Sequence, residues 1–149
     1  MFETVTCAPE ETEALAARLA RDLRSGDLVA LRGDLGAGKT TFVRGACRAL
    51  GVTRPVTSPT FTIANRYSGD GVDVAHLDLY RFQGVEPEEW VAVEPSLEDA
   101  ICFVEWPDVG LACLPEPRVV VTFGHESPEQ RRIAVECADA ALLQRLQGC

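Results

Sequence analysis

The sequence is short of lysine, and this shortage is its most informative absence. Lys39 is the only lysine among the 14 basic residues, and the others are all arginines. Lysine ends in a compact ammonium group, whereas arginine carries a broad planar guanidinium. A chain biased toward arginine that keeps one lysine suggests that position 39 needs the smaller cation, although coincidence would leave the same pattern.

Long apolar runs and paired cysteines are also missing. No apolar run approaches the ~20 residues of a membrane-spanning helix, and the acidic start MFETVTCAPEE lacks the basic and apolar regions of a signal peptide. We therefore expect a cytoplasmic protein with no membrane partner. The six cysteines show no C-x-x-C pair or metal-ligand spacing. Most of them are expected to be buried, reduced thiols rather than zinc ligands or disulfides.

Positive charge is scarce as well. The net charge is −9, and no basic stripe with interleaved aromatic residues is present. Such a chain is not expected to bind nucleic acid unaided, and direct DNA binding is not expected at all. A small acidic protein of this kind could still act on RNA through a basic partner.

One stretch, GDLGAGKTT at residues 33–41, matches the pattern G-x-x-x-x-G-K-S/T. The alternating run at 27–32 before it predicts a buried strand, and the apolar spacing at 40–50 after it predicts a helix. A glycine-rich turn that caps a helix is the simpler interpretation. The order strand, glycine loop, helix favours a nucleotide-binding P-loop instead.

The residue types of this loop fit phosphate chemistry. Glycines allow successive backbone N–H groups to face an anion, and the following helix adds partial positive charge at its N-terminus. Lys39 can reach the β and γ phosphates, and the Thr40 hydroxyl can ligate Mg²⁺. Asp34 would repel phosphate if it pointed inward, so we expect it to face outward or to orient water bound to Mg²⁺.

The remaining pattern predicts a single domain with alternating strands and helices. A turn at Ser68–Gly71 splits two β-branched arms and predicts a hairpin. The continuously apolar run AICFV predicts a central strand covered on both faces. Residues 86–94 are expected to be helical or an irregular connection. The expected strands are 3–7, 27–32, 61–67, 72–80, 100–104, 118–123 and 131–137, and the expected helices are 9–24, 40–50 and 138–146.

Two acidic residues are candidates for the metal and the attacking water. Glu105 follows the apolar strand directly, where ligand sites form in open α/β sheets, although an ordinary strand-end acid would look the same. Asp78 in HLDLYR shares a strand face with apolar residues, which is costly unless it is exposed, paired or bound to metal. A salt bridge from Asp78 to Arg66 or Arg81 is the alternative. His76 is expected to be a packed, hydrogen-bonded histidine rather than a catalytic one.

Two short stretches near these acids stay open to two interpretations. The hydroxyl-rich TSPT at residues 57–60 is either a loop that senses the γ-phosphate or a plain loop. Trp106-Pro107 is either a hinge or a packed turn.

Four stretches in this order and spacing resemble the bacterial TsaE (YjeE) family: GDLGAGKTTFVRG, VTSPTFT, HLDLYR and AICFVEWP. The family consists of small ATPases of tRNA threonylcarbamoyladenosine (t6A37) biosynthesis. The resemblance implies one P-loop ATPase domain over residues 1–149, with an α/β fold of the P-loop NTPase type. That fold is a three-layer sandwich whose mostly parallel central sheet carries an antiparallel hairpin insertion. The chain departs from the family pattern at residues 90–95, WVAVEP, where a glycine followed by an aromatic residue is usual.

The resemblance also implies the residues of the site. Mg²⁺ would be held by Thr40 and Glu105, and Asp78 would act in hydrolysis through the metal or the attacking water, beside Lys39. Thr12 would contact adenine, and residues 57–62 would form a switch-like loop. The loop residues expected to bind ATP are Asp34, Gly36, Ala37, Gly38, Lys39, Thr40 and Thr41.

The family resemblance implies partners as well. Family members associate with the TsaD–TsaB heterodimer and reach tRNA indirectly through that complex, without transferring the threonylcarbamoyl group themselves. Weak hydrolysis that rises with the partner is therefore expected, and Arg66 or Arg81 could either assist it or form structural ion pairs. A small-molecule kinase and a binding module with negligible ATP turnover are the alternatives. No arginine-rich lid supports the kinase, and the absence of N/T-K-x-D favours ATP over GTP.

Overall fold

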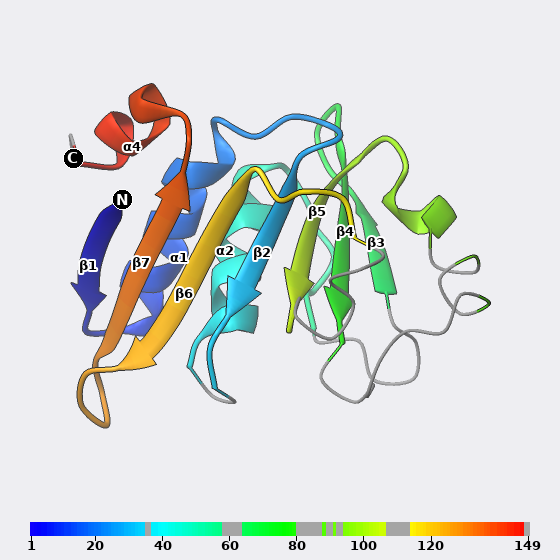
Figure 1. The fold of residues 1–149 in the computed structure, drawn as a ribbon. Helices are drawn as coiled ribbons and strands as arrows, with labels where there is room; N and C mark the ends of the chain where they lie inside the picture. Colours follow the sequence, from blue (N-terminus) through cyan, green and yellow to red (C-terminus); the bar gives the residue numbers. More distant parts are fainter. Residues whose placement is uncertain are drawn as a thin grey trace.

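The computed structural model describes residues 1–34, 37–57, 64–79, 88, 91, 94–106 and 114–147. They form a seven-stranded sheet in the order β1-β7-β6-β2-β5-β4-β3, with helices packed against it (Figure 1). The α/β fold predicted from the sequence is confirmed. The elements are β1 (Phe2–Thr6), α1 (Pro9–Ala20), β2 (Leu28–Arg32), α2 (Lys39–Ala49), β3 (Ala64–Ser68), β4 (Asp73–Asp78), the 3-10 helix η1 (Glu94–Leu97), β5 (Ala100–Glu105), β6 (Val119–His125), β7 (Arg131–Cys137) and α4 (Ala140–Gln147).

The centre of the sheet is parallel and its edges are antiparallel. Strands β6, β2, β5 and β4 run in one direction as neighbours, whereas β3 turns back along β4 and β7 turns back along β6. Parallel neighbours end at the same edge of a sheet, which is where ligand sites of open α/β sheets form. Here that edge carries the ends of β2, β4 and β5, with Leu31 and Asp78 both in register with Glu105.

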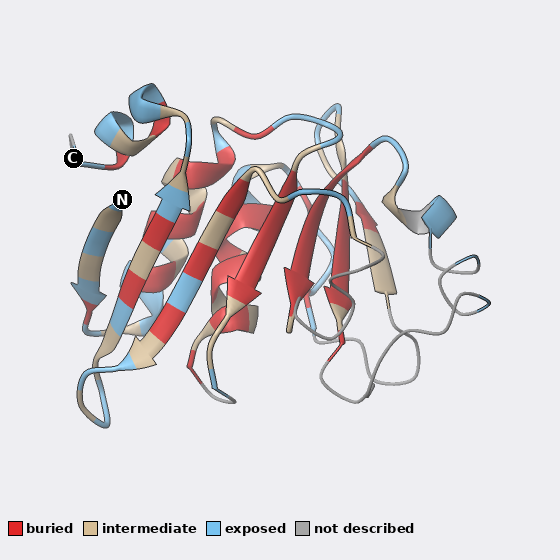
Figure 2. Cartoon of the chain, in the orientation of Figure 1, coloured by how far each residue is buried: buried red, intermediate tan, exposed pale blue. Residues whose placement is uncertain are grey.

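The two faces of the sheet bury separate apolar clusters. On one face, α1, α2 and α4 contribute Leu15, Phe42 and Leu142 to a large core against the strands. The smaller cluster on the other face is joined by Leu97, Trp106 and Leu114. Strand β5 is buried along its whole length, as predicted for a central strand, whereas β6 and β7 alternate between buried and more exposed residues (Figure 2).

Most expected elements are present, with one helix shorter than predicted. The hairpin is confirmed by the antiparallel pairing of β3 with β4. Helix α1 ends at Ala20 rather than Arg24, because Asp22 N and Leu23 N bond to carbonyls three residues back. The chain then turns as Arg24 N donates to Asp27 Oδ2 at 2.8 Å. Among the residues that the structure describes, no helix has the length and apolar character needed to cross a membrane.

The packing of α1 against α2 depends on Gly45, and its replacement gives the first prediction. A Cβ at this position would lie 2.4 Å from the carbonyl oxygen of Glu13 and 2.5 Å from its Cα. Backbone atoms cannot rotate away, so Gly45→Ala should lower the free energy of unfolding by about 1–3 kcal/mol. This loss would exceed the roughly 1 kcal/mol by which alanine favours a helix interior. Urea denaturation measures the difference.

Gly124→Ala in β6 is the matched control for this substitution. Nothing lies within 4 Å of the position that its Cβ would take. The control should therefore stay within about 0.5 kcal/mol of the wild type. Equal stabilities of the two alanine variants would contradict the prediction.

Candidate nucleotide-binding site

Two glycines shape the loop between β2 and α2. Gly33 follows β2 with a φ of 145°, and a Cβ there would lie 2.7 Å from the carbonyl oxygen of Phe123. Gly38 precedes the first residue of α2 with a φ of 104°, in the left-handed region. Both conformations favour glycine, because a side chain would be strained or would clash. The fixed glycines of the sequence pattern thus match real backbone requirements, while Gly36 lies outside the described residues.

Lys39 opens α2 and is almost fully buried, with an exposed fraction of 4%. Its Nζ donates to the carbonyl oxygen of Gly33 at 2.5 Å and lies 3.7 Å from the centre of the Trp106 ring. Burial lowers the pKa of Lys39, while the carboxylates of Glu105, Asp78 and Asp34 act in the opposite direction. Three candidate acids thus act electrostatically on the single lysine of the chain.

The two predicted catalytic acids sit side by side. Asp78 ends β4, Glu105 ends β5, and the two residues are register partners on parallel strands. Glu105 is 3% exposed, and its Oε2 accepts a hydrogen bond of 3.2 Å from Thr40 Oγ1. The structure thus brings the candidate residues Lys39, Thr40, Asp78 and Glu105 to one edge of the sheet.

A second buried contact reaches the same carboxylate. His76 Nε2 lies 2.5 Å from Glu105 Oε2, and both side chains are buried. The sequence indicated a packed, hydrogen-bonded histidine, and the structure confirms it. The identity of its partner was not predicted, because it follows from the register between β4 and β5.

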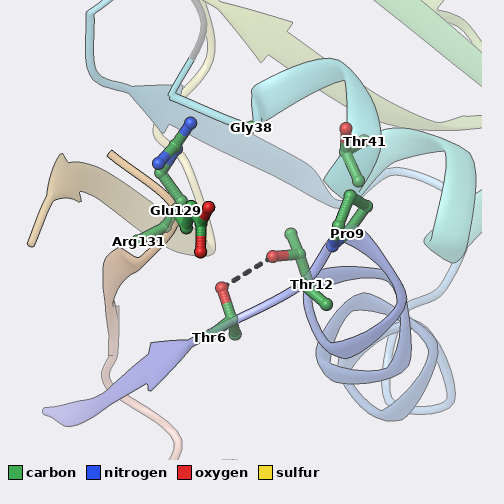
Figure 3. A pocket seen from close by; sticks show the side chains of 8 residues that line it. Thr6, Pro9, Thr12, Gly38, Thr41, Glu129 and Arg131 are labelled. Carbon is green, nitrogen blue, oxygen red and sulfur yellow. Dashed lines mark hydrogen bonds between the residues drawn. The ribbon is translucent and has the colours of Figure 1, made fainter. Parts of the chain in front are cut away.

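A cavity of about 120 Å³ lies beside the loop (Figure 3). Gly38 and Thr41 contribute to one wall, and the start of α1 contributes Thr12, which the family resemblance assigned to adenine. Thr6 and Thr12 are both buried, and their hydroxyls are joined by a hydrogen bond of 2.8 Å. The cavity thus brings Thr12 and Thr41 together.

Two further residues that line this cavity were not predicted from the sequence. Glu129 and Arg131 come from the turn between β6 and β7 and from the start of β7. They reach the cavity because β1 pairs with β7, which places Thr6 opposite Arg131. The polar stretch GHESPEQ lies between the expected strands 118–123 and 131–137, but no local signal showed that it folds back against the N-terminal strand.

The remaining candidate residues of the sequence analysis lie as follows. Asp34 is exposed, and its carbonyl accepts a 3.1 Å bond from the N–H of buried Ala37. Arg66 forms an ion pair of 2.9 Å with Asp73, which is one of the two roles expected of it. Thr57 is exposed at the start of the hydroxyl-rich stretch. Residues 58–62, 90, 92 and 93, Arg81 and Pro107 lie outside the described residues.

Comparisons with known proteins relate the chain to one family. The family model for TsaE, described as threonylcarbamoyl adenosine biosynthesis protein TsaE, matches residues 6–133. The tRNA threonylcarbamoyladenosine biosynthesis protein TsaE of Bacillus subtilis is 39% identical over 128 residues, covering 86% of this chain and 80% of the relative. Its counterpart in Streptomyces coelicolor is 42% identical over 128 residues, covering 81% of this chain and 86% of the relative.

A solved structure is similar over nearly the whole chain. The crystal structure of Bacillus subtilis YdiB superposes with a TM-score of 0.80 at 31% identity, covering 98% of this chain and 93% of the other. The match of the family model to most of the chain, the identities of these relatives and the shared fold lead to one conclusion. This chain belongs to the TsaE family.

Proposed function

We propose that this chain is a Mg²⁺-dependent ATPase that acts in the synthesis of threonylcarbamoyladenosine in tRNA. The observation that carries the proposal is the convergence of Lys39, Thr40, Asp78 and Glu105 at the end of three strands. Relatives at about two-fifths identity are named for this biosynthesis. We further propose that the chain works in the cytoplasm with the TsaD–TsaB heterodimer, and that it reaches tRNA only through that complex.

The loop supplies positive charge where a triphosphate would lie. Lys39 presents one ammonium group, and α2 begins at that residue with the partial positive charge of its N-terminus. Trp106 covers the ammonium on one side. A charge with little surrounding water acts more strongly on nearby phosphate oxygens than the same charge in bulk solvent. Lys39 would therefore bind and orient the terminal phosphates.

The side chains near Lys39 also suit Mg²⁺. This ion prefers oxygen ligands and keeps several waters, so it needs only a few protein groups. Thr40 contributes a hydroxyl and Glu105 a carboxylate that are already in contact, with Asp78 on the neighbouring strand. Thr40 and Glu105 would hold the ion, which when bound would neutralise negative charge on the phosphates. Asp78 would accept a hydrogen bond from the attacking water and orient it.

The cavity beside the loop is the proposed adenine site. It is bordered by Gly38 and Thr41, the residues that flank Lys39 and Thr40. In the Thr6–Thr12 pair, one hydroxyl donates to the other, so one O–H and several lone pairs stay available. The edge of adenine offers both donors and acceptors, which such a pair could satisfy.

Removal of the Thr12 hydroxyl tests this assignment. Thr12→Val keeps the shape of the side chain but loses one hydrogen-bonding group at the cavity. Loss of one hydrogen bond costs about 0.5–1.5 kcal/mol, so the affinity for ATP should fall about two- to tenfold. Calorimetric titration with ATP and GTP measures both the loss and any change in base preference.

Thr4→Val is the matched control. Thr4 lies on the same strand as Thr6 but lines a different groove, between β1 and α1. The control should bind ATP like the wild type. An unchanged affinity in Thr12→Val would remove this cavity as the adenine site and leave the phosphate site unaffected.

The proposed function is tested by the rate of phosphate release. We expect weak hydrolysis by the isolated chain and a clear increase when TsaD–TsaB is added. Formation of modified tRNA from purified components should stop when this chain is omitted. Equal rates of phosphate release with and without the heterodimer would contradict the proposal. Full modification of tRNA when this chain is omitted would contradict it as well.

A further inference from the structure

The ring of His76 is enclosed between the strands and points at a predicted metal ligand. The side chain has an exposed fraction of 0%, and that of Glu105 is 4% exposed. Nε2 lies 2.5 Å from Glu105 Oε2. The other ring nitrogen, Nδ1, is buried and has no hydrogen-bond partner among the residues that the structure describes. Among the described residues, Nε2 of the ring thus has a hydrogen-bond partner and Nδ1 has none.

The contact between the two side chains restrains both of them. His76 and Glu105 are buried, so the hydrogen bond between Nε2 and Oε2 cannot be exchanged for one to bulk water without opening the site. The ring and the carboxylate therefore hold each other in one relative orientation.

The same contact fixes which carboxylate oxygen is available. Oε2 of Glu105 accepts from both Thr40 Oγ1 and His76 Nε2. No hydrogen bond from the described part of the chain reaches Oε1. Two hydrogen bonds to one oxygen hold the carboxylate group in a single orientation. In this orientation Oε1 is available to other groups.

We propose that His76 is a positioning residue that orients Glu105 for Mg²⁺. Its side chain does not line the cavity beside the loop, and within the described residues its one side-chain hydrogen bond goes to the carboxylate of Glu105. The inference rests on the proposed function in one respect, namely that Glu105 ligates the ion. Partners that hold a metal ligand in place typically affect metal affinity by about 10–100-fold.

Two amide substitutions separate this role from simple packing. In His76→Gln the side-chain NH₂ can reach the position of Nε2, whereas in the shorter His76→Asn it falls near the position of Nδ1. We expect the gain in ATPγS affinity on adding Mg²⁺, relative to EDTA, to fall about tenfold or more in H76N. The gain should stay near the wild-type value in H76Q. In EDTA, both variants should bind ATPγS like the wild type.

A double-mutant cycle with Glu105→Gln identifies the route of the effect. If His76 acts through Glu105, H76N should cause no further loss of the Mg²⁺-dependent gain in the E105Q background. Equal losses of affinity with and without Mg²⁺, or full additivity of the two substitutions, would overturn the inference. So would a folded H76N variant with the Mg²⁺ dependence of the wild type.

The hydrogen bond of His76 can be tested by NMR without any nucleotide. The chain has only two histidines, His76 and His125, so a His125→Gln variant assigns their ¹⁵N NMR signals. We expect the Nε2 signal of His76 to show the directly bonded proton of a hydrogen bond to Glu105, and an Nε2 without a bonded proton would overturn the inference by itself. A wild-type protein whose ATPγS affinity does not respond to Mg²⁺ would instead contradict the proposed function.

Discussion

Replacing Lys39 by alanine should lower the rate of ATP hydrolysis by about 10²–10³-fold, the loss expected when one preorganised donor to a developing charge is removed. Nucleotide affinity should fall as well, because the ammonium is the only lysine charge in the chain and lies at the start of α2. Phosphate-release assays and calorimetric titration with ATP measure the two effects. Modification of tRNA in the reconstituted system should fail with the same variant.

Two further variants show whether the effect is specific. Lys39→Arg keeps the charge but places a broad guanidinium between the Gly33 carbonyl and the Trp106 ring, so it should not restore turnover. Arg48→Ala removes a positive charge from the same helix, at a side chain that is 71% exposed and paired with Glu13. It should hydrolyse ATP normally. Wild-type turnover by Lys39→Ala would exclude the proposed phosphate site.

The second large effect is expected at the paired acids. Asp78→Asn and Glu105→Gln keep the size of each side chain but remove its charge, so turnover should fall about 10²-fold or more. Some ATP should remain bound, since Lys39 and the loop backbone are unchanged. Single-turnover hydrolysis and equilibrium binding, measured on the same samples, separate the two properties.

The same pair of variants distinguishes an ATPase from an ATP-regulated binding module. A module without significant turnover would lose nothing in tRNA modification when either acid is neutralised, provided that ATP still binds. Asp73→Asn is the control, because Asp73 lies at the other end of β4 and pairs with Arg66. Normal hydrolysis by both Asp78→Asn and Glu105→Gln would reject the catalytic assignment.

The parts of the site that depend on neighbouring residues in the sequence could be predicted. The loop pattern identified Gly33, Gly38 and Lys39, since their requirements come from backbone conformation and local charge. Glu105 could be found because it follows an apolar strand directly. Asp78 could be found because an acid on a strand face with apolar residues is costly unless it is exposed, paired or bound to metal. The hairpin was also predictable, since its turn residues lie between two β-branched arms.

Other parts depend on pairings between distant segments and were not predictable. The contact of His76 with Glu105 requires the register of β4 on β5. Glu129 and Arg131 join the cavity only because the first strand pairs with β7. Even the early end of α1 follows from competing hydrogen bonds in its last turn, which the apolar spacing did not show. Non-local geometry of this kind leaves no trace in residue spacing.

Because the cavity beside the loop is closed by Thr6 from β1 and Arg131 from β7, a ligand held there would bridge segments that lie far apart in the sequence. A chain emerging from the ribosome could not complete this enclosure until β7 had been synthesised and paired with β1. Ligand binding would then favour the fully folded state over every partly folded one, in proportion to ligand concentration relative to the dissociation constant. Cellular nucleotide levels would thereby set the resistance of this protein to proteolysis as well as its rate of work.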